Sequence, residues 1–244
     1  MSHTHHEGTI APISLEDPAL GDLFFPPRYH SCRPLAFYSQ YWGLGEGALL
    51  DNDNIFRPRG QNALYFFKQY EYMVKRIDSF RAYCKDLERR RLCLPHALPG
   101  VVIIGTPGIG ESVWPLYLGE GLTAFLTGKT SFLKYYLARE LSKGNPVIYI
   151  NGAGCYIFNG RHVYVSGTVP HFGLGFLHTL CLVDADTKTP APAYLLHSSY
   201  PFLLMAASRQ EEHYSRWTEQ RASGLSPKFV LNPPEEDELV RASV

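Results

Sequence analysis

The feature that most constrains this chain is a glycine-rich segment that directly follows a short apolar run. Residues 101–104 are Val-Val-Ile-Ile, a β-branched run that predicts a buried parallel strand. The next six residues are Gly105, Thr106, Pro107, Gly108, Ile109 and Gly110. They supply the first part of the Walker A pattern G-x-x-x-x-G-K-[ST], in which glycines let backbone N–H groups turn inward around phosphate oxygens. The segment therefore predicts a phosphate-binding loop at the end of a strand.

The cationic half of the motif does not follow directly. Glu111 and Ser112 come next, where the motif needs a lysine for the phosphates and a hydroxyl for Mg²⁺, and a carboxylate at the lysine position repels phosphate. The missing residue types occur further along, in Gly128, Lys129, Thr130 and Ser131. Removing residues 111–128 (128 − 110 = 18 residues) joins the glycine loop to the lysine and threonine and restores a complete motif.

The origin of this 18-residue segment has two interpretations. Gly110-Glu111-Ser112 can be encoded with the splice-donor sequence GTGAGT, and Thr127-Gly128 with an acceptor AG in the same codon phase. The segment corresponds to 3 × 18 = 54 nucleotides, the size of a short intron. We predict a retained intron, with a natural loop insertion as the alternative. In both cases the glycines are separated from the lysine, so we expect nucleotide affinity to be severely weakened in this chain.

The remaining pattern predicts an α/β fold. Apolar residues at three- and four-residue spacing predict a long amphipathic helix over 61–92 and a second helix over 129–143, which Gly144 would cap. Further buried strands are predicted at 147–150, 180–183 and 202–207, and Asn159-Gly160 predicts a tight turn between strands 155–158 and 161–165. We expect a parallel sheet flanked by helices.

Two parts of the chain are expected from these elements. Residues 1–95 form an aromatic-rich N-terminal extension, irregular up to about residue 60 and then helical. Residues 96–244 form the phosphate-loop domain, with the interruption at 111–128 and a C-terminal part that we expect to be truncated.

Polar residues after two later strands could complete a nucleotide site. Asp184 closes the strand 180–183, as does the aspartate that holds Mg²⁺ in P-loop proteins; a simple strand-end aspartate is the alternative. Asp186 could orient a water molecule, and Ser208 ends the strand 202–207, where a polar group can lie near the γ-phosphate. We therefore assign catalytic roles to Lys129 and Asp186, and Mg²⁺ binding to Thr130 and Asp184. The expected nucleotide-binding residues are Gly105, Thr106, Pro107, Gly108, Ile109, Gly110, Gly128, Lys129, Thr130, Ser131 and Ser208.

Composition limits the classes of partner. Lys+Arg and Asp+Glu are both 23, so the net charge gives no reason to expect nucleic acid or an anionic membrane, and we interpret Arg89–Arg91 as a solvated helix face. The five cysteines form no C-x-x-C pair, which favours a reducing compartment. The start of the chain lacks the apolar region of a signal peptide, and no apolar run is long enough for a bilayer. We expect an intracellular protein, cytoplasmic or nuclear.

The split motif and its flanking sequence carry a family resemblance. Pro95–Gly110 with Lys129–Tyr136 resembles fungal P-loop NTPases related to crinkler effectors and to the retrotransposon hot spot (RHS) proteins of trypanosomes. The likeness extends over roughly residues 36–240 and includes Phe37–Trp42, Leu182–Asp184, Ala206–Ser208 and Asn232–Leu239. The chain departs from the family pattern at Glu111 to Gly128, and it ends where relatives continue into a helical region.

The resemblance implies an ATPase-like core of the additional-strand type, with Mg²⁺ and with ATP rather than GTP. We expect Mg-ATP binding and slow hydrolysis in the uninterrupted form, impaired in this chain. The alternative is a non-catalytic pseudo-NTPase that acts as an interaction module or effector. A nucleic-acid-processing effector would depend on the family resemblance alone.

Overall fold

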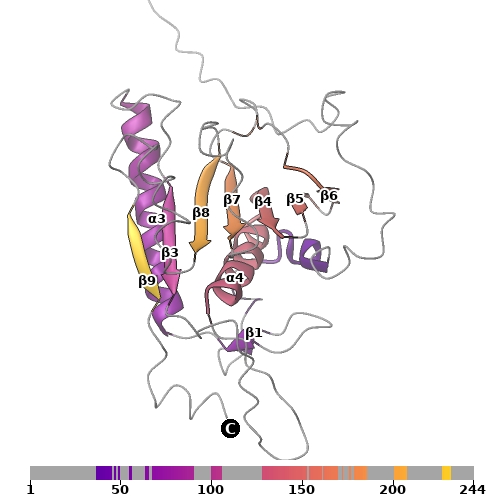
Figure 1. The fold of residues 1–244 in the computed structure, drawn as a ribbon, viewed down its shortest axis with the longest axis horizontal. Helices are drawn as coiled ribbons and strands as arrows, with labels where there is room; N and C mark the ends of the chain where they lie inside the picture. The colour runs from indigo at the N-terminus through magenta and orange to yellow at the C-terminus, as the bar shows by residue number, and fades with distance from the viewer. Residues whose placement is uncertain are drawn as a thin grey trace, which may run out of the picture.

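The fold is organised around one mixed, mostly parallel sheet. The computed structural model describes residues 37–45, 47, 49, 55–56, 64–65, 68–90, 100–105, 128–152, 154–160, 162–169, 172, 176, 179–185, 201–207 and 227–231. Within these ranges seven strands are hydrogen-bonded in the order β6-β5-β4-β7-β8-β3-β9 (Figure 1). They are β3 (Val101–Gly105), β4 (Val147–Asn151), β5 (Gly154–Asn159), β6 (His162–Ser166), β7 (Leu180–Asp184), β8 (Phe202–Ala207) and β9 (Lys228–Leu231). The predicted α/β class is confirmed.

Five strands of this sheet run parallel to one another. β4, β7, β8, β3 and β9 pair in parallel, so their carboxyl ends lie at one edge of the sheet. Asp184 of β7 is in register with Ala206 of β8, and Ala206 with Ile103 of β3. β3 and β8 are buried along their whole length, as expected for strands covered on both faces. The register therefore places Asp184 near the level at which β3 ends.

An antiparallel meander completes the other side of the sheet. The predicted hairpin is confirmed between β5 and β6, but Asn159 pairs with His162, so β5 extends one residue further than predicted. β4 also pairs with β5 in antiparallel fashion, from Val147 with Phe158 to Asn151 with Gly154. This second hairpin was not predicted, because the β-branched run 147–150 indicates a strand without indicating its neighbour.

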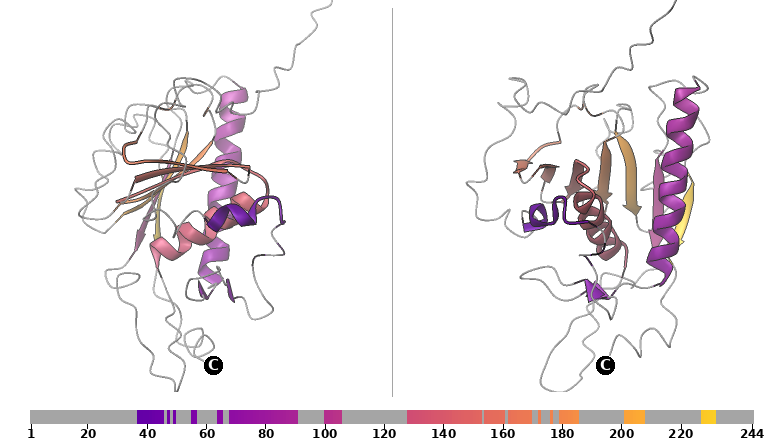
Figure 2. Two further views of the ribbon diagram at one scale, coloured as in Figure 1. Left: turned by 90° about the vertical axis from the view of Figure 1, so that its right-hand side faces the viewer. Right: turned by 180° about the vertical axis from the view of Figure 1, so that it is seen from behind.

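Helices cover one face of the sheet. The 3₁₀ helix η2 (Phe37–Tyr41), α3 (Lys68–Arg89) and α4 (Lys129–Ser142) all lie on this face, and their apolar residues share one core with it (Figure 2). A second core on the opposite face includes Phe172 and Phe176. None of the helices in the described part of the chain is both long and apolar enough to cross a membrane.

Helix α3 is shorter than the predicted range 61–92. Leu64–Tyr65 forms a short strand, β2, that pairs antiparallel with β1 (Ile55–Phe56). The prediction that the helix includes Leu64 was therefore wrong, because the backbone of Leu64 pairs with strand β1. The helix itself begins at Lys68 and buries Tyr70, Met73, Val74, Ile77 and Cys84.

The carboxyl end of α4 is closed by two sets of backbone hydrogen bonds. Gly144, at φ 76°, donates to the Leu141 carbonyl at 2.9 Å, and Asn145 donates to the Glu140 carbonyl at 3.0 Å. These bonds form a Schellman motif, so the predicted cap at Gly144 is confirmed. After η2, the N–H groups of Gly43 and Gly45 donate to the carbonyls of Leu141 and Ser142, at 2.9 and 3.0 Å. The aromatic N-terminal segment is thus attached to the end of α4.

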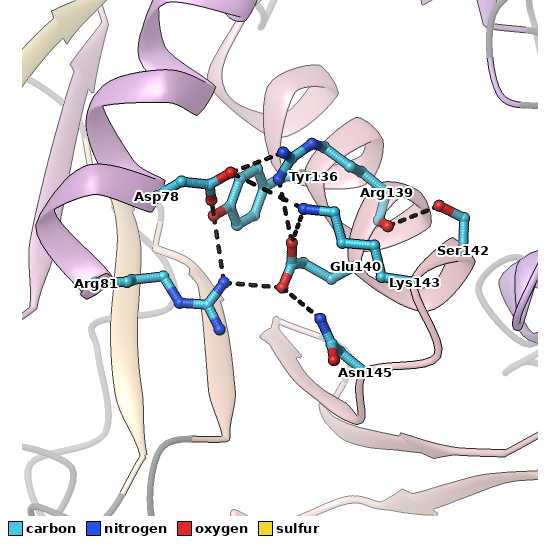
Figure 3. Close-up of polar contacts among 8 residues, drawn as sticks. All are labelled: Asp78, Arg81, Tyr136, Arg139, Glu140, Ser142, Lys143 and Asn145. Carbon is cyan, nitrogen blue, oxygen red and sulfur yellow. Dashed lines mark hydrogen bonds and ion pairs between the residues drawn. The ribbon is translucent and has the colours of Figure 1, made fainter. Parts of the chain in front are cut away.

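A group of charged and polar side chains, buried at its centre around Glu140, joins α3 to α4 (Figure 3). We call it the α3–α4 charge network, and its members are Asp78, Arg81, Tyr136, Arg139, Glu140, Lys143 and Asn145. Glu140 is at its centre, because its carboxylate meets Arg81 at 2.8 Å and both Arg139 and Lys143 at 3.1 Å. Asp78 pairs with Arg139 at 2.7 Å and accepts a hydrogen bond from Tyr136 at 2.6 Å. Charged side chains from two helices thereby satisfy one another within the protein.

The charge network predicts a loss of stability in acid. Burial raises the pKa of Glu140, but the charges and hydrogen bonds of Arg81 and Lys143 more than offset this, so the pKa lies below its ordinary value of 4.5. The pKa of Asp78 likewise lies below 3.8, because hydrogen bonds from Tyr136 and Arg139 outweigh burial. A carboxyl whose pKa is lower in the folded state stabilises the fold above its ordinary pKa, and this contribution is lost as the pH falls through the folded value. We expect the free energy of unfolding, measured in urea, to fall once the pH drops below these ordinary values. The decline should be shallower for Glu140→Gln; equal declines would contradict the prediction.

Candidate functional site

The end of β3 and the start of α4 meet at the carboxyl edge of the sheet. Gly105 is the last residue of β3 and Lys129 the first residue of α4. A Cβ atom added to Gly105 would lie 2.8 Å from both Cγ and Cδ of Lys129. The aliphatic part of the lysine therefore lies directly against the glycine, and any side chain at position 105 would displace it. Residues that are 129 − 105 = 24 positions apart in the sequence are thus in contact.

The next residue of α4 contacts the end of β7. The Thr130 hydroxyl donates to Oδ1 of Asp184 at 3.1 Å. The Tyr149 hydroxyl, from β4, donates to Oδ2 of the same carboxylate at 3.3 Å. Burial raises the pKa of Tyr149 well above its ordinary value of 10.0, and the negative charge of Asp184 adds to this effect. Tyr149 is therefore protonated at neutral pH, and each oxygen of Asp184 has a donor.

Positive charge gathers on the same side of α4. Lys134 lies one turn after Thr130, at the spacing that places two side chains on one helix face. Burial lowers the pKa of Lys134, whereas the negative charge of Asp184 acts in the opposite direction. Lys134 thus places an ammonium group near the Asp184 carboxylate, and the helix dipole at the N-terminus of α4 also favours an anion.

Thr130 and Asp184 could supply two oxygen ligands to a metal ion. Mg²⁺ takes oxygen ligands at about 2.0–2.1 Å in octahedral geometry, so neighbouring ligand oxygens lie roughly 2.9 Å apart. The separation between Thr130 Oγ1 and Asp184 Oδ1 is 3.1 Å. No group of three or more His, Cys, Asp and Glu that could hold a metal occurs among the described residues. The Thr130 hydroxyl and the Asp184 carboxylate therefore have the spacing of two neighbouring ligands of one ion.

Several predicted site residues fall outside the described part of the chain. These are Thr106, Pro107, Gly108, Ile109, Gly110, Asp186 and Ser208. Of the others, Gly128 is buried at the N-cap of α4 and Ser131 is buried in its first turn, at 4 % exposure. Lys129, Thr130, Gly105 and Asp184 come together at one edge of the sheet.

Two tyrosines at this edge were missed by the sequence analysis. Tyr149 contacts Asp184 as described above, and Tyr70 of α3 contacts the backbone of Gly128. Tyr149 belongs to an apolar pattern that predicts a strand, and Tyr70 to one that predicts a helix. Such patterns do not indicate which group a phenol oxygen will contact. Finding them requires the order of the strands and the position of α3.

No protein-family model, curated protein or solved structure matches this chain in sequence or fold comparisons.

Proposed function

We propose that this chain is a P-loop NTPase-like protein whose site binds Mg-ATP and, in the uninterrupted form, hydrolyses it slowly. The observation that carries the proposal is the 3.1 Å hydrogen bond between Thr130 and Asp184. These residues were assigned to Mg²⁺ from the sequence alone, and they lie 54 positions apart. The contact between Lys129 and Gly105 supports the same conclusion, since it joins the two halves of the split motif.

The order of the strands adds support. β8 lies between β3, which ends in the glycine loop, and β7, which ends in Asp184. An extra strand at this position agrees with the additional-strand core that the family resemblance implies. The proposed site also lies at the carboxyl ends of parallel strands, where open α/β sheets bind their ligands.

Each residue has a definite role in this proposal. The Lys129 ammonium neutralises charge on the β- and γ-phosphates, and the N-terminus of α4 offers N–H groups to the same anion. Thr130 and Asp184 would hold Mg²⁺, and the bound ion would supply positive charge to the phosphate oxygens. Tyr149 keeps Asp184 oriented. Asp186 is proposed to orient the attacking water.

The interruption should weaken this site in the present chain. In the restored motif, four residues separate Gly105 from the glycine before the lysine, whereas here 127 − 105 = 22 residues do so. The N–H groups of the glycine loop are thus no longer held next to Lys129 by a short connection. Because several donors must converge on one phosphate, we expect affinity to fall substantially.

Calorimetry with Mg-ATP tests the proposal on the full chain and on a version that lacks residues 111–128. We expect the shortened chain to bind at least tenfold more tightly, and removal of Mg²⁺ with a chelator to weaken binding in both. Equal, tight binding by both would show that the interruption is harmless. Binding by neither would refute the nucleotide proposal and leave the alternative below.

The alternative is a pseudo-NTPase that keeps the fold without turnover. It is favoured by Glu111 at the lysine position and by the Gly128 N–H, which already donates to Tyr70 rather than facing a ligand. Phosphate release separates the two proposals, because a pseudo-NTPase that still binds Mg-ATP would release none above the level of a Lys129→Met control.

A further inference from the structure

Helix α3 is hydrogen-bonded to the residue that precedes the proposed phosphate-binding lysine. The Gly128 N–H donates to the Tyr70 hydroxyl at 2.9 Å, and that hydroxyl donates to the Gly128 carbonyl at 3.0 Å. Tyr70 is 3 % exposed, and its ring meets Phe132 edge-on at 5.3 Å. One phenol on α3 thus holds both backbone polar groups of Gly128.

Among the described residues, no other side chain caps the start of α4. Gly128 is the N-cap at φ 128° and ψ −169°, a conformation that favours glycine. Because glycine has no side chain, it cannot make the side-chain hydrogen bond by which an N-cap residue usually caps a helix. The Gly128 carbonyl also accepts the first helical bond, from the Phe132 N–H at 2.9 Å. Tyr70 therefore supplies, from a different helix, the contact that an N-cap side chain usually supplies.

Chain connectivity explains why such a contact matters here. A connection of four residues between Gly105 and the glycine before the lysine would hold the start of α4 beside the end of β3. A connection of 22 residues constrains its two ends less, by roughly tenfold on the usual logarithmic dependence on loop length. The observed contact between Lys129 and Gly105 consequently needs another source of support.

Helix α3 is well placed to give that support, because it is attached along the length of α4. Tyr70 holds the N-cap residue of α4, and the apolar face of α3 shares a core with α4. Arg81 binds Glu140 near the other end at 2.8 Å. α3 is in turn held by Asp78, which pairs with Arg139 of α4 at 2.7 Å. A helix fixed in this way can restrain the N-terminus of its neighbour without help from the loop.

We propose that Tyr70 is a positioning residue that holds Gly128, and through it Lys129 and Thr130, at the carboxyl edge of the sheet in place of a short phosphate loop. The inference rests on the proposed function for its significance, since it concerns the end of α4 that would meet phosphate. A tyrosine with only a structural role would have the same effect at any loop length. The proposal instead requires that the effect of losing the Tyr70 hydroxyl depends on the length of the connection between 105 and 128.

Amide hydrogen exchange tests this without any nucleotide. In the full chain, Tyr70→Phe should accelerate exchange of Gly128 and of the amides through Leu133 by about tenfold, as expected for the loss of a buried hydrogen bond. The matched control is Tyr72→Phe on the same helix, where the side chain is 60 % exposed, and it should leave these amides unchanged. In the chain lacking residues 111–128, Gly110 rather than Gly128 precedes Lys129. There Tyr70→Phe should change the exchange of the amides from Lys129 through Leu133 by less than threefold, because the short loop restrains the same residues.

Each outcome decides the proposal. Equal acceleration by Tyr70→Phe in the long and short chains would show that Tyr70 is an ordinary packing residue, and it would overturn the proposal. An effect of Tyr72→Phe equal to that of Tyr70→Phe would overturn it as well. If Tyr70→Phe does not fold, the unaltered chain supplies the test: the Gly128 amide should exchange at least about 100-fold more slowly than an unprotected amide, and fast exchange would overturn the proposal. Failure of Mg-ATP binding would leave these exchange rates unaffected, so it would refute the proposed function alone.

Discussion

Replacing Lys129 with methionine in the chain that lacks residues 111–128 should weaken Mg-ATP binding by about 100-fold, the upper range for loss of a charged hydrogen bond. Methionine keeps an unbranched apolar stem, so the contact with Gly105 is preserved while the ammonium is lost. Calorimetry at fixed ionic strength measures the change, because exposed charges are sensitive to salt. The variant therefore separates the charge of the lysine from its packing.

The matched control is Lys75→Met, which removes a lysine from the exposed face of α3. Its side chain is 72 % exposed and pairs with Glu71 one turn away, so binding should be unchanged. Gly105→Ala approaches the same contact from the other side: a Cβ 2.8 Å from Lys129 should push the lysine aside and weaken binding less than Lys129→Met does. A Lys129→Met chain that binds within threefold of its parent would remove Lys129 from the proposed site.

The parts of the fold that were predicted correctly are those with strong local signals. β7 and β8 were expected at 180–183 and 202–207 and occur at Leu180–Asp184 and Phe202–Ala207, because strands buried on both faces appear as continuous apolar runs. α4 was expected over 129–143 and ends at Ser142 for the reason predicted, a glycine in the left-handed region one residue past the C-cap. The edge at which Thr130 and Asp184 meet follows from these elements, since carboxyl ends of parallel strands coincide.

Other elements depend on contacts that leave no local signal. β9 has only four residues, Lys-Phe-Val-Leu, and two of them are exposed; it is a strand because its backbone pairs with β3. Leu64 matched the spacing of a helix but pairs with Phe56 instead. Short segments of this kind take their structure from a partner that is distant in sequence, so propensity and periodicity cannot identify them.

The burial of charged residues on α3 and α4 also could not be predicted from local sequence. Charged side chains are expected on the surface, yet Glu140 is 1 % exposed and Arg139 is 9 % exposed. They are buried because Asp78 and Arg81 on α3 provide opposite charges at hydrogen-bonding distance. The sequence places these four residues on two helices, but their pairing requires the helices to be docked in one register. Tyr70 was missed for the same reason.

Replacing Glu140 with alanine should be the most destabilising of these substitutions, by about 3–5 kcal/mol, the range for breaking a buried ion pair on one side. The change would leave Arg81 and Arg139, whose side chains are 14 % and 11 % exposed, with one fewer carboxylate between them. It would also remove the acceptor for Asn145 at 3.2 Å. Urea unfolding followed by circular dichroism at neutral pH measures the loss.

Glu71→Ala is the control for that experiment, because Glu71 is also a helical glutamate in an ion pair but is 57 % exposed. Exposed pairs of this kind contribute no more than about 0.5 kcal/mol, so its unfolding curve should almost coincide with that of the parent. A cost below about 1 kcal/mol for Glu140→Ala would mean that the remaining cations regain water easily, and the charge network would then not be a firm attachment. A large cost would instead establish that α4 is fixed to α3 at the end opposite Lys129, which is the condition under which Tyr70 can hold the other end in place.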